Sequence, residues 1–119
     1  MKEEWLKAFR TMTYGIYALT SAHEKQVNAM IASWVSQVSY EPALIAVAVH
    51  PNRYSHELIE KSGSFGLHVL KKNQKTLVAR FMEPDPAEKL KDIEWQPGKT
   101  GCPLLKDCAA LLDRSVALL

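Results

Sequence analysis

The chain has 119 residues, of which 47% are hydrophobic and 24% charged, and its formal net charge is +2. This length suits one domain, and the composition is that of an ordinary globular protein rather than a disordered or fibrous one. The weak net charge and the lack of a Lys/Arg cluster argue against a nucleic-acid partner. The longest apolar run, residues 43–49, is too short to span a membrane. We therefore expect a single domain over residues 1–119 with neither a nucleic-acid nor a membrane partner.

The N-terminus and the cysteines indicate the compartment. Residues 1–4 lack the apolar segment of a secretory signal peptide. Cys102 and Cys108 have no second pair and no nearby histidine, so their spacing supports neither a disulfide framework nor a zinc site. We interpret both as ordinary thiols, with a redox-active pair as the alternative. A cytoplasmic protein without a metal site is expected.

The first elements in chain order are a helix and two strands. Residues 2–12 predict a short amphipathic helix whose apolar positions are Trp5, Leu6, Phe9 and Met12. Residues 16–20 are rich in β-formers and predict a strand, and the polar residues 21–26 predict a hairpin-like loop. A second strand is predicted over residues 27–35.

The predicted strand over residues 27–35 is unusual because neither of its faces is clearly polar. One face carries Val27, Ala29, Ile31 and Ser33, and the other carries Asn28, Met30, Ala32 and Trp34. Such a strand has to be covered on both sides. A central strand between two layers of protein is one interpretation, and a flat ligand over part of one face is the other.

The middle of the chain predicts a strand, a turn and a helix. Residues 43–49 form an apolar run that predicts a fully buried strand, and residues 50–54 predict a turn. A helix follows over residues 55–60, with Ser55 as its N-cap and Gly63 in the left-handed position beyond its end.

The last third of the chain predicts a further strand and two helices. Residues 65–70 alternate as a strand, Asn73 is expected to cap one helix, and Asp85 is expected to cap one more short turn. Residues 93–103 predict a surface loop, and residues 111–116 predict the start of another strand. Strands and single helices without regular βαβ alternation favour an α+β class with a mostly antiparallel sheet or barrel. Neither a Gly-x-Gly-x-x-Gly motif nor a phosphate loop is present in the sequence.

Four segments carry a resemblance to a known family. They are Asn28-Ala29-Met30-Ile31-Ala32-Ser33-Trp34-Val35-Ser36-Gln37-Val38-Ser39, Glu41-Pro42-Ala43-Leu44, Asn52-Arg53-Tyr54-Ser55 and Phe65-Gly66-Leu67-His68-Val69-Leu70. In order, spacing and residue type they resemble the flavin-reductase-like family of FMN-binding split barrels, which includes flavoredoxins. The resemblance covers about residues 9 to 116. It implies an antiparallel Greek-key split β-barrel, α+β or mainly β, with a few short helices.

A flavin needs an apolar slot for its ring, polar groups along the ring's edge and a cationic pocket for its phosphate. Residues 28–34 offer the first two on one extended segment. By resemblance this is the isoalloxazine-binding strand, and its candidate contacts are Asn28, Ala29, Met30, Ala32, Ser33 and Trp34. An ordinary core position for Trp34 is the alternative.

The phosphate end of the flavin has its own candidates. Arg53 offers a planar fork of donors, and Ser55 offers a hydroxyl at the N-terminus of a helix, where free N–H groups favour an anion. The resemblance adds a serine near the phosphate. The candidate contacts are Ser39, Pro51, Asn52, Arg53, Tyr54 and Ser55. An exposed turn arginine and a purely capping serine are the alternatives.

No protein side chain is expected to be the reactive centre. The sequence shows neither a nucleophile with its base nor a carboxylate pair, which suits a flavoprotein whose flavin N5 accepts hydride. We interpret His50 and His68 as hydrogen-bonded structural histidines. A general acid/base role is the alternative for both.

The resemblance implies a flavin-dependent oxidoreductase, an NAD(P)H-dependent flavin reductase or a flavoredoxin-like electron carrier, that holds FMN non-covalently. Its electrons would come from a nicotinamide or a protein donor and leave to a free flavin, a metal complex or a partner protein. A non-catalytic FMN-binding or interaction module is the alternative. Relatives usually continue past the position of Val116, so the barrel is expected to be shortened at its C-terminus and open. A homodimer that protects the open edge is expected.

Overall fold

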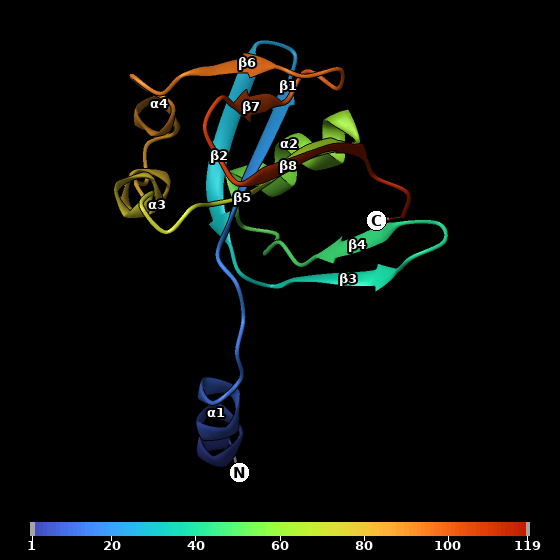
Figure 1. Cartoon of the computed structure of the whole chain (residues 1–119), viewed down its shortest axis with the longest axis vertical. Coiled ribbons are helices and arrows are strands. Elements are labelled where there is room, and N and C mark those ends of the chain that lie inside the picture. Colours follow the sequence, from blue (N-terminus) through green and yellow to red (C-terminus); the bar gives the residue numbers. More distant parts are fainter. Residues whose placement is uncertain (1, 119) are drawn as a thin grey trace.

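The computed structural model describes residues 2–118, which form four helices, eight strands and three antiparallel sheets (Figure 1). In chain order the elements are α1 (Lys2–Arg10), β1 (Tyr17–His23), β2 (Gln26–Ala32), β3 (Val35–Ser39), β4 (Leu44–Val47), α2 (Tyr54–Ser62), β5 (Ser64–Val69), α3 (Lys75–Phe81), α4 (Pro86–Lys89), β6 (Trp95–Pro97), β7 (Pro103–Leu105) and β8 (Ala110–Ser115). The α+β, antiparallel class expected from the sequence is confirmed.

The main sheet has the strand order β2-β1-β5-β8, and all its pairs are antiparallel. The expected loop over residues 21–26 is wrong in extent, since β1 runs to His23 and only Glu24 and Lys25 form the turn. Ser21 is fully buried, as is Thr20, whose hydroxyl donates to the Pro103 carbonyl across 2.6 Å. The ladder continues through Ser21, which pairs with Asn28 of β2, so this buried polar residue belongs to a strand rather than to a loop.

Both faces of β2 are covered by protein, as its sequence predicts. On one face Met30 packs with Leu19 and with Ile59 of α2. On the other face Ala29 packs with Phe81 of α3 and with other residues from the second half of the chain. The main sheet is therefore the middle layer of the domain, which accounts for the lack of a polar face on β2.

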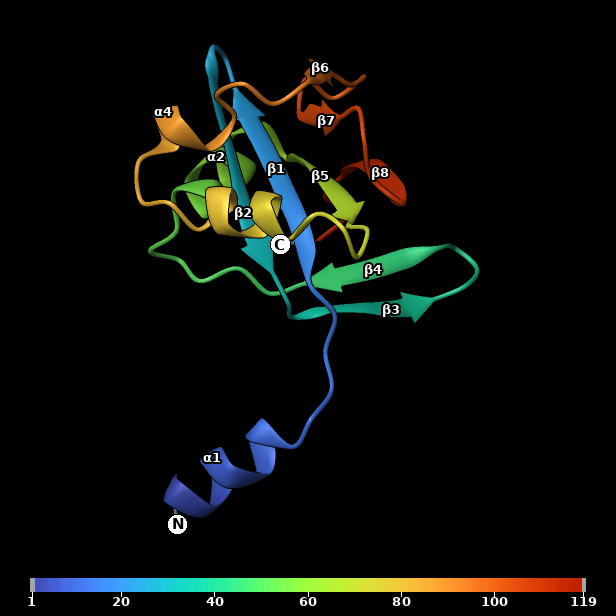
Figure 2. The same ribbon diagram turned by 60° about the vertical axis from the view of Figure 1, so that its left-hand side comes forward.

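Two parts of the chain project from this layered body. Figures 1 and 2 show α1 at the end of an extended linker and the β3–β4 hairpin reaching outward from the end of the main sheet. The strand predicted over residues 27–35 therefore breaks at Ser33 and Trp34, where the chain leaves the main sheet.

The prediction of a fully buried strand over residues 43–49 is wrong. β4 is shorter and alternates between exposed and half-buried residues, because β3 is its only neighbouring strand among the described residues.

The other predicted elements agree with the structure to different degrees. Gly63 follows α2 with a φ of 72°, in the left-handed region expected, and the Asp85 carboxylate caps α4 by accepting from the Ala87 N–H. Asn73 is not the cap of α3, because Gln74 occupies that position. The loop predicted over residues 93–103 contains part of the hairpin of β6 and β7, which the sequence did not reveal.

The C-terminal strand β8 pairs with β5 and forms one edge of the main sheet, where the sequence predicted the start of a strand. Among residues 2–118, none of the helices has both the length and the apolar character needed to cross a membrane.

Candidate functional site

The N-terminus of α2 is the centre of the candidate site. The helix begins at Tyr54 and its N-cap is Arg53, whose side chain makes no capping hydrogen bond. The expectation that Ser55 caps the helix is therefore wrong. Ser55 lies inside the first turn and is fully buried. Its hydroxyl accepts a hydrogen bond from a residue of the main sheet.

That residue is Asn28 of β2, whose side-chain N–H donates to Ser55 Oγ across 2.8 Å. Asn28 is only 2% exposed, and its Oδ1 has no hydrogen-bond partner. Ser21, its register partner on β1, has a buried hydroxyl that also lacks a partner. Two unsatisfied polar atoms beside α2 are unusual in a folded core.

One cation, Arg53, stands at this helix end, and a second, Lys89, lies on α4, which packs against β2. Arg53 is exposed, whereas Lys89 at the end of α4 is only 9% exposed. Burial, and to a smaller extent the charge of Arg53, lowers the pKa of Lys89. Sequence reasoning missed Lys89. The sequence does signal the short helix that carries this lysine, because Asp85 caps the helix and Pro86 is its first residue.

The residues predicted to contact the flavin ring fall into two groups. Asn28, Ala29, Met30 and Ala32 are buried within the chain. In contrast, Trp34 is 71% exposed at the start of the β3–β4 hairpin, and the neighbouring Ser33 is half-buried. An exposed indole beside a buried strand offers a flat apolar surface, while the buried side chains shape the sheet behind it.

The residues predicted to contact the phosphate end are only partly brought together. Asn52, Arg53, Tyr54 and Ser55 surround the start of α2, directly after Pro51. Ser39 ends β3 at the outer part of the hairpin, which points away from α2 in Figure 2. Within this chain, Ser39 therefore stands apart from the other candidates.

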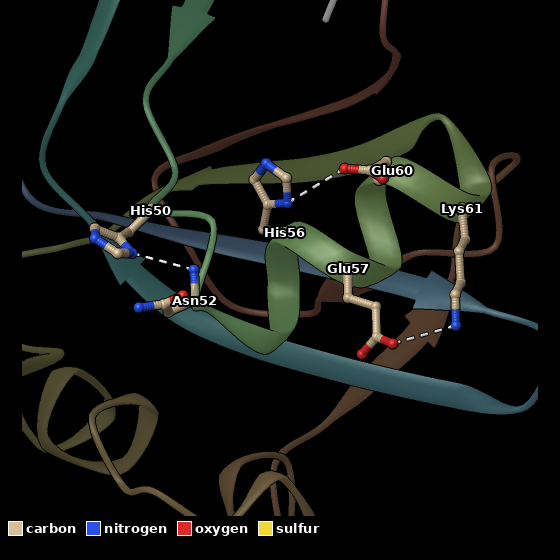
Figure 3. A network of polar contacts seen from close by, with 6 residues as sticks. All are labelled: His50, Asn52, His56, Glu57, Glu60 and Lys61. Carbon is tan, nitrogen blue, oxygen red and sulfur yellow. Dashed lines mark hydrogen bonds and ion pairs between the residues drawn. The ribbon is translucent and has the colours of Figure 1, made fainter.

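The loop before α2 is fixed by a histidine. His50 Nδ1 accepts the Asn52 N–H across 3.1 Å, the hydrogen-bonded role expected for this residue (Figure 3). Further along α2, His56 lies 3.6 Å from Glu60 and Lys61 pairs with Glu57 across 3.2 Å. The acidic residue in the first turn and the lysine in the last turn both favour the helix dipole.

His68 is a structural histidine, as expected. It is fully buried on β5, where Nδ1 lies 3.2 Å from the Ala18 carbonyl and Nε2 accepts the Leu105 N–H across 3.1 Å. These contacts require the neutral ring with its proton on Nδ1. Burial lowers the pKa of His68, which favours the same neutral form.

The cysteines show no sign of activation. Cys102 is buried and Cys108 half-buried, and burial raises the pKa of both thiols, which disfavours the reactive thiolate. Over residues 2–118, the side chains form no group of three or more His, Cys, Asp or Glu that could hold a metal ion.

Two surface hollows lie outside the candidate site. One, of about 330 Å³, is lined mainly by charged residues of α3, α4 and the turn after α4. The other, of about 510 Å³, lies between α3 and β7. Neither is lined by a residue predicted to contact the flavin.

The family model of the flavin reductase like domain matches residues 9–117. The chain belongs to this family, and the fold class and family expected from the sequence are both confirmed.

Individual relatives show the same relationship. The chain is 32% identical over 115 residues to the ferric-chelate reductase (NAD(P)H) of Archaeoglobus fulgidus, covering 93% of this chain and 68% of the relative. It is also 32% identical over 114 residues to diflavin flavoprotein A 1 of Synechocystis, where the match covers 93% of this chain and 20% of that protein. The crystal structure of an FMN-binding protein from Thermus thermophilus with bound 1-cyclohex-2-enone superposes with a TM-score of 0.80 at 26% identity, over 90% of this chain and 61% of that one. The chain thus spans about a fifth of the diflavin flavoprotein.

Proposed function

We propose that the protein is a flavin-dependent oxidoreductase that binds FMN non-covalently at the N-terminus of α2. The observation that carries this proposal is the arrangement of Arg53, the first turn of α2 and the buried Asn28–Ser55 pair. A cation and a helix N-terminus are what a flavin phosphate requires. The family and the relatives named for NAD(P)H and flavin chemistry support the same activity.

In this proposal the chain's own residues bind and orient the cofactor. Arg53, together with Asn52, Tyr54 and the α2 N–H groups, holds the phosphate. Exposed Trp34 and half-buried Ser33 contact the ring, and Ser39 joins the site from the hairpin of a second copy of the chain. The sheet residues Asn28, Ala29, Met30 and Ala32 keep the strand behind the ring rigid. When bound, FMN supplies the atom that accepts and donates hydride, and NAD(P)H is the proposed electron donor.

We also propose that a second copy of the chain completes the site. Trp5 and Phe9 on α1, and Trp34 and Tyr40 on the hairpin, each expose more than half of their side chain. At about 200 Å² for each aromatic side chain, they present roughly 500 Å² of apolar surface on the two projecting elements. A stable interface buries about 800 Å² from each partner, so these elements account for much of a dimer contact. In this proposal the hairpin of the second copy supplies the part of the site that Ser39 represents. The protein is expected in the cytoplasm.

Anaerobic titration of the FMN-loaded protein with NADH and with NADPH tests the oxidoreductase. Bleaching of the bound flavin by either nucleotide identifies a reductase and its donor. Flavin that binds but stays oxidised, and is reduced only by a redox-partner protein, identifies an electron carrier. Bound flavin that no donor reduces supports the non-catalytic module instead.

A further inference from the structure

The hollow between α3 and β7, of about 510 Å³, has an apolar floor made by Leu77, Ile93 and Leu105. Leu105 is only 2% exposed, and the half-buried Leu77 and Ile93 pack against the core cluster that contains it. The floor is therefore continuous with the core of the domain. A hollow of this size with an apolar floor is typical of sites for small organic molecules.

Polar contacts hold the walls of this hollow together. At one side, Gln74 Oε1 accepts the Lys71 N–H across 2.7 Å, and Gln74 Nε2 donates to the Asp107 carbonyl across 2.8 Å. Lys71 also forms an ion pair with Asp107. At the other side, the Lys106 N–H donates to the Glu94 carbonyl, and their side chains pair across 3.1 Å. The hollow is therefore formed in the free chain, which lowers the entropic cost of binding a ligand.

Two polar side chains of the hollow are available to a ligand. Asn73 and Thr76 both line it and are exposed. Among the hydrogen bonds of residues 2–118, none uses the Asn73 carboxamide or the Thr76 hydroxyl. A carboxamide presents a donor beside an acceptor, which matches the N6 and N7 edge of adenine. A hydroxyl can donate to and accept from the hydroxyls of a sugar.

The charges around the hollow favour an anion. Its two acidic lining residues, Glu94 and Asp107, are each paired with a lysine. Lys72 and Lys75 are exposed, and neither has a carboxylate partner within residues 2–118. Each of these two lysines is adjacent in sequence to residues that line the hollow. The paired charges cancel, so Lys72 and Lys75 leave a positive potential beside the apolar floor.

We propose that this hollow binds an adenine nucleotide. The base lies on the apolar floor and hydrogen-bonds with Asn73, the ribose contacts Thr76, and the phosphate lies against Lys72 and Lys75. A flat aromatic base buries apolar surface while its polar edge reaches a partner. The other hollow, lined by charged residues, offers no such floor.

This nucleotide site is separate from the proposed flavin site, since none of the residues predicted to contact the flavin lines the hollow. The inference therefore stands or falls independently of the proposed function. The chemistry that the hollow recognises, an adenosine phosphate, occurs both in free adenine nucleotides and in the adenosine half of NAD(P)H.

Calorimetric titration of the full chain with 5′-AMP tests the site. We expect the wild type to bind AMP, and the double substitution Lys72→Met and Lys75→Met to weaken binding at least about tenfold, because it keeps both aliphatic stems and removes both charges. Lys91→Met combined with Lys99→Met is the matched control, since these lysines are also exposed and without an ion pair among the described residues. The control should bind AMP as the wild type does. Absence of binding to the wild type, or an equal loss in the control, would overturn the inference.

Further titrations locate the nucleotide. Asn73→Ala should weaken AMP binding, and ribose 5-phosphate, which lacks the base, should bind the wild type at least about tenfold more weakly than AMP does. Arg53→Gln should keep the affinity for AMP, and FMN should not displace AMP. Equal affinity for ribose 5-phosphate would reduce the site to a phosphate contact and overturn the inference. Loss of AMP binding in Arg53→Gln, or displacement by FMN, would place the nucleotide in the proposed flavin site and overturn it as well.

Titration with NADH identifies the source of the nucleotide. A loss of NADH affinity in the Lys72/Lys75 double variant that equals its loss of AMP affinity supports the site as the holder of the adenosine half of the dinucleotide. An unchanged NADH affinity together with a loss of AMP affinity supports a site for free adenine nucleotides. Either result holds for a chain that binds no flavin, so failure of the proposed function would leave this inference intact.

Discussion

The Asn28 side chain donates to the Ser55 hydroxyl across 2.8 Å and so joins β2 to the first turn of α2. Both residues are almost fully buried, so water does not compete for this contact. The proposed ring-facing strand and the proposed phosphate site are therefore held at a fixed distance from each other by one polar pair. This pair makes the two halves of the proposed flavin site a single structural unit.

Ser55→Ala is expected to lower the free energy of unfolding by about 1–3 kcal/mol, because it leaves the buried Asn28 N–H without an acceptor. Urea denaturation measures the change. Ser36→Ala is the control, since Ser36 is exposed on β3 and its loss should cost less than about 0.5 kcal/mol. Equal effects of the two substitutions would show that the Asn28–Ser55 contact is not stabilising.

Arg53→Ala is expected to weaken FMN binding by about 1.5–3 kcal/mol, which corresponds to roughly 10- to 150-fold, because it removes a charge-assisted contact to the phosphate. Fluorescence titration provides the dissociation constant. Arg114→Ala, an exposed arginine on β8, serves as the control and should bind FMN as the wild type does. An unchanged dissociation constant in Arg53→Ala would remove this residue from the site.

His68 is expected to make the stability of the protein depend on pH. Its folded-state pKa lies below the ordinary value of 6.5, so the unfolded chain binds more protons between the two values. Stability contributed by neutral His68 is therefore present above pH 6.5 and is lost as the pH falls below it toward the lowered pKa. His68→Gln should lose this part of the pH dependence.

Thermal unfolding of both proteins between pH 7.5 and about pH 5 measures the difference, because all other titrating groups are common to them. The wild type should lose more stability on acidification than His68→Gln does. Parallel profiles would mean that His68 titrates alike in the folded and unfolded chains.

The double substitution Trp5→Glu and Phe9→Glu is expected to reduce dimerisation, since it places charges on the apolar side of α1. Neither residue is buried within the chain, so the fold of the monomer should remain intact. Light scattering after gel filtration gives the mass of each form. A wild type that elutes as a monomer at micromolar concentration would refute the proposed homodimer.

The sequence predicts the body of the fold well where a local signal is strong. The two apolar faces of residues 27–35 indicate a middle layer, and Gly63 and Asp85 mark helix ends by known backbone and capping preferences. Ser21 is the opposite case, because a buried polar residue in a strand looks like a loop residue in the sequence alone.

The candidate site is predictable only in part for similar reasons. The helix start at residues 52–55 follows from turn and capping preferences, so Arg53 is found from the sequence. Lys89 comes from a separate helix, and its burial depends on how α4 packs against β2. The capping role of Ser55 was mispredicted because the competing partner, Asn28, lies 27 residues earlier in the chain.

The binding of FMN itself tests the account most directly. The purified chain is mixed with FMN, passed through a desalting column and examined by its visible spectrum. We predict that the protein fraction is yellow and holds about one FMN per chain, as expected for one built site in each copy. A colourless protein fraction, with all FMN in the small-molecule fraction and no change in flavin fluorescence on titration, would contradict the proposed function.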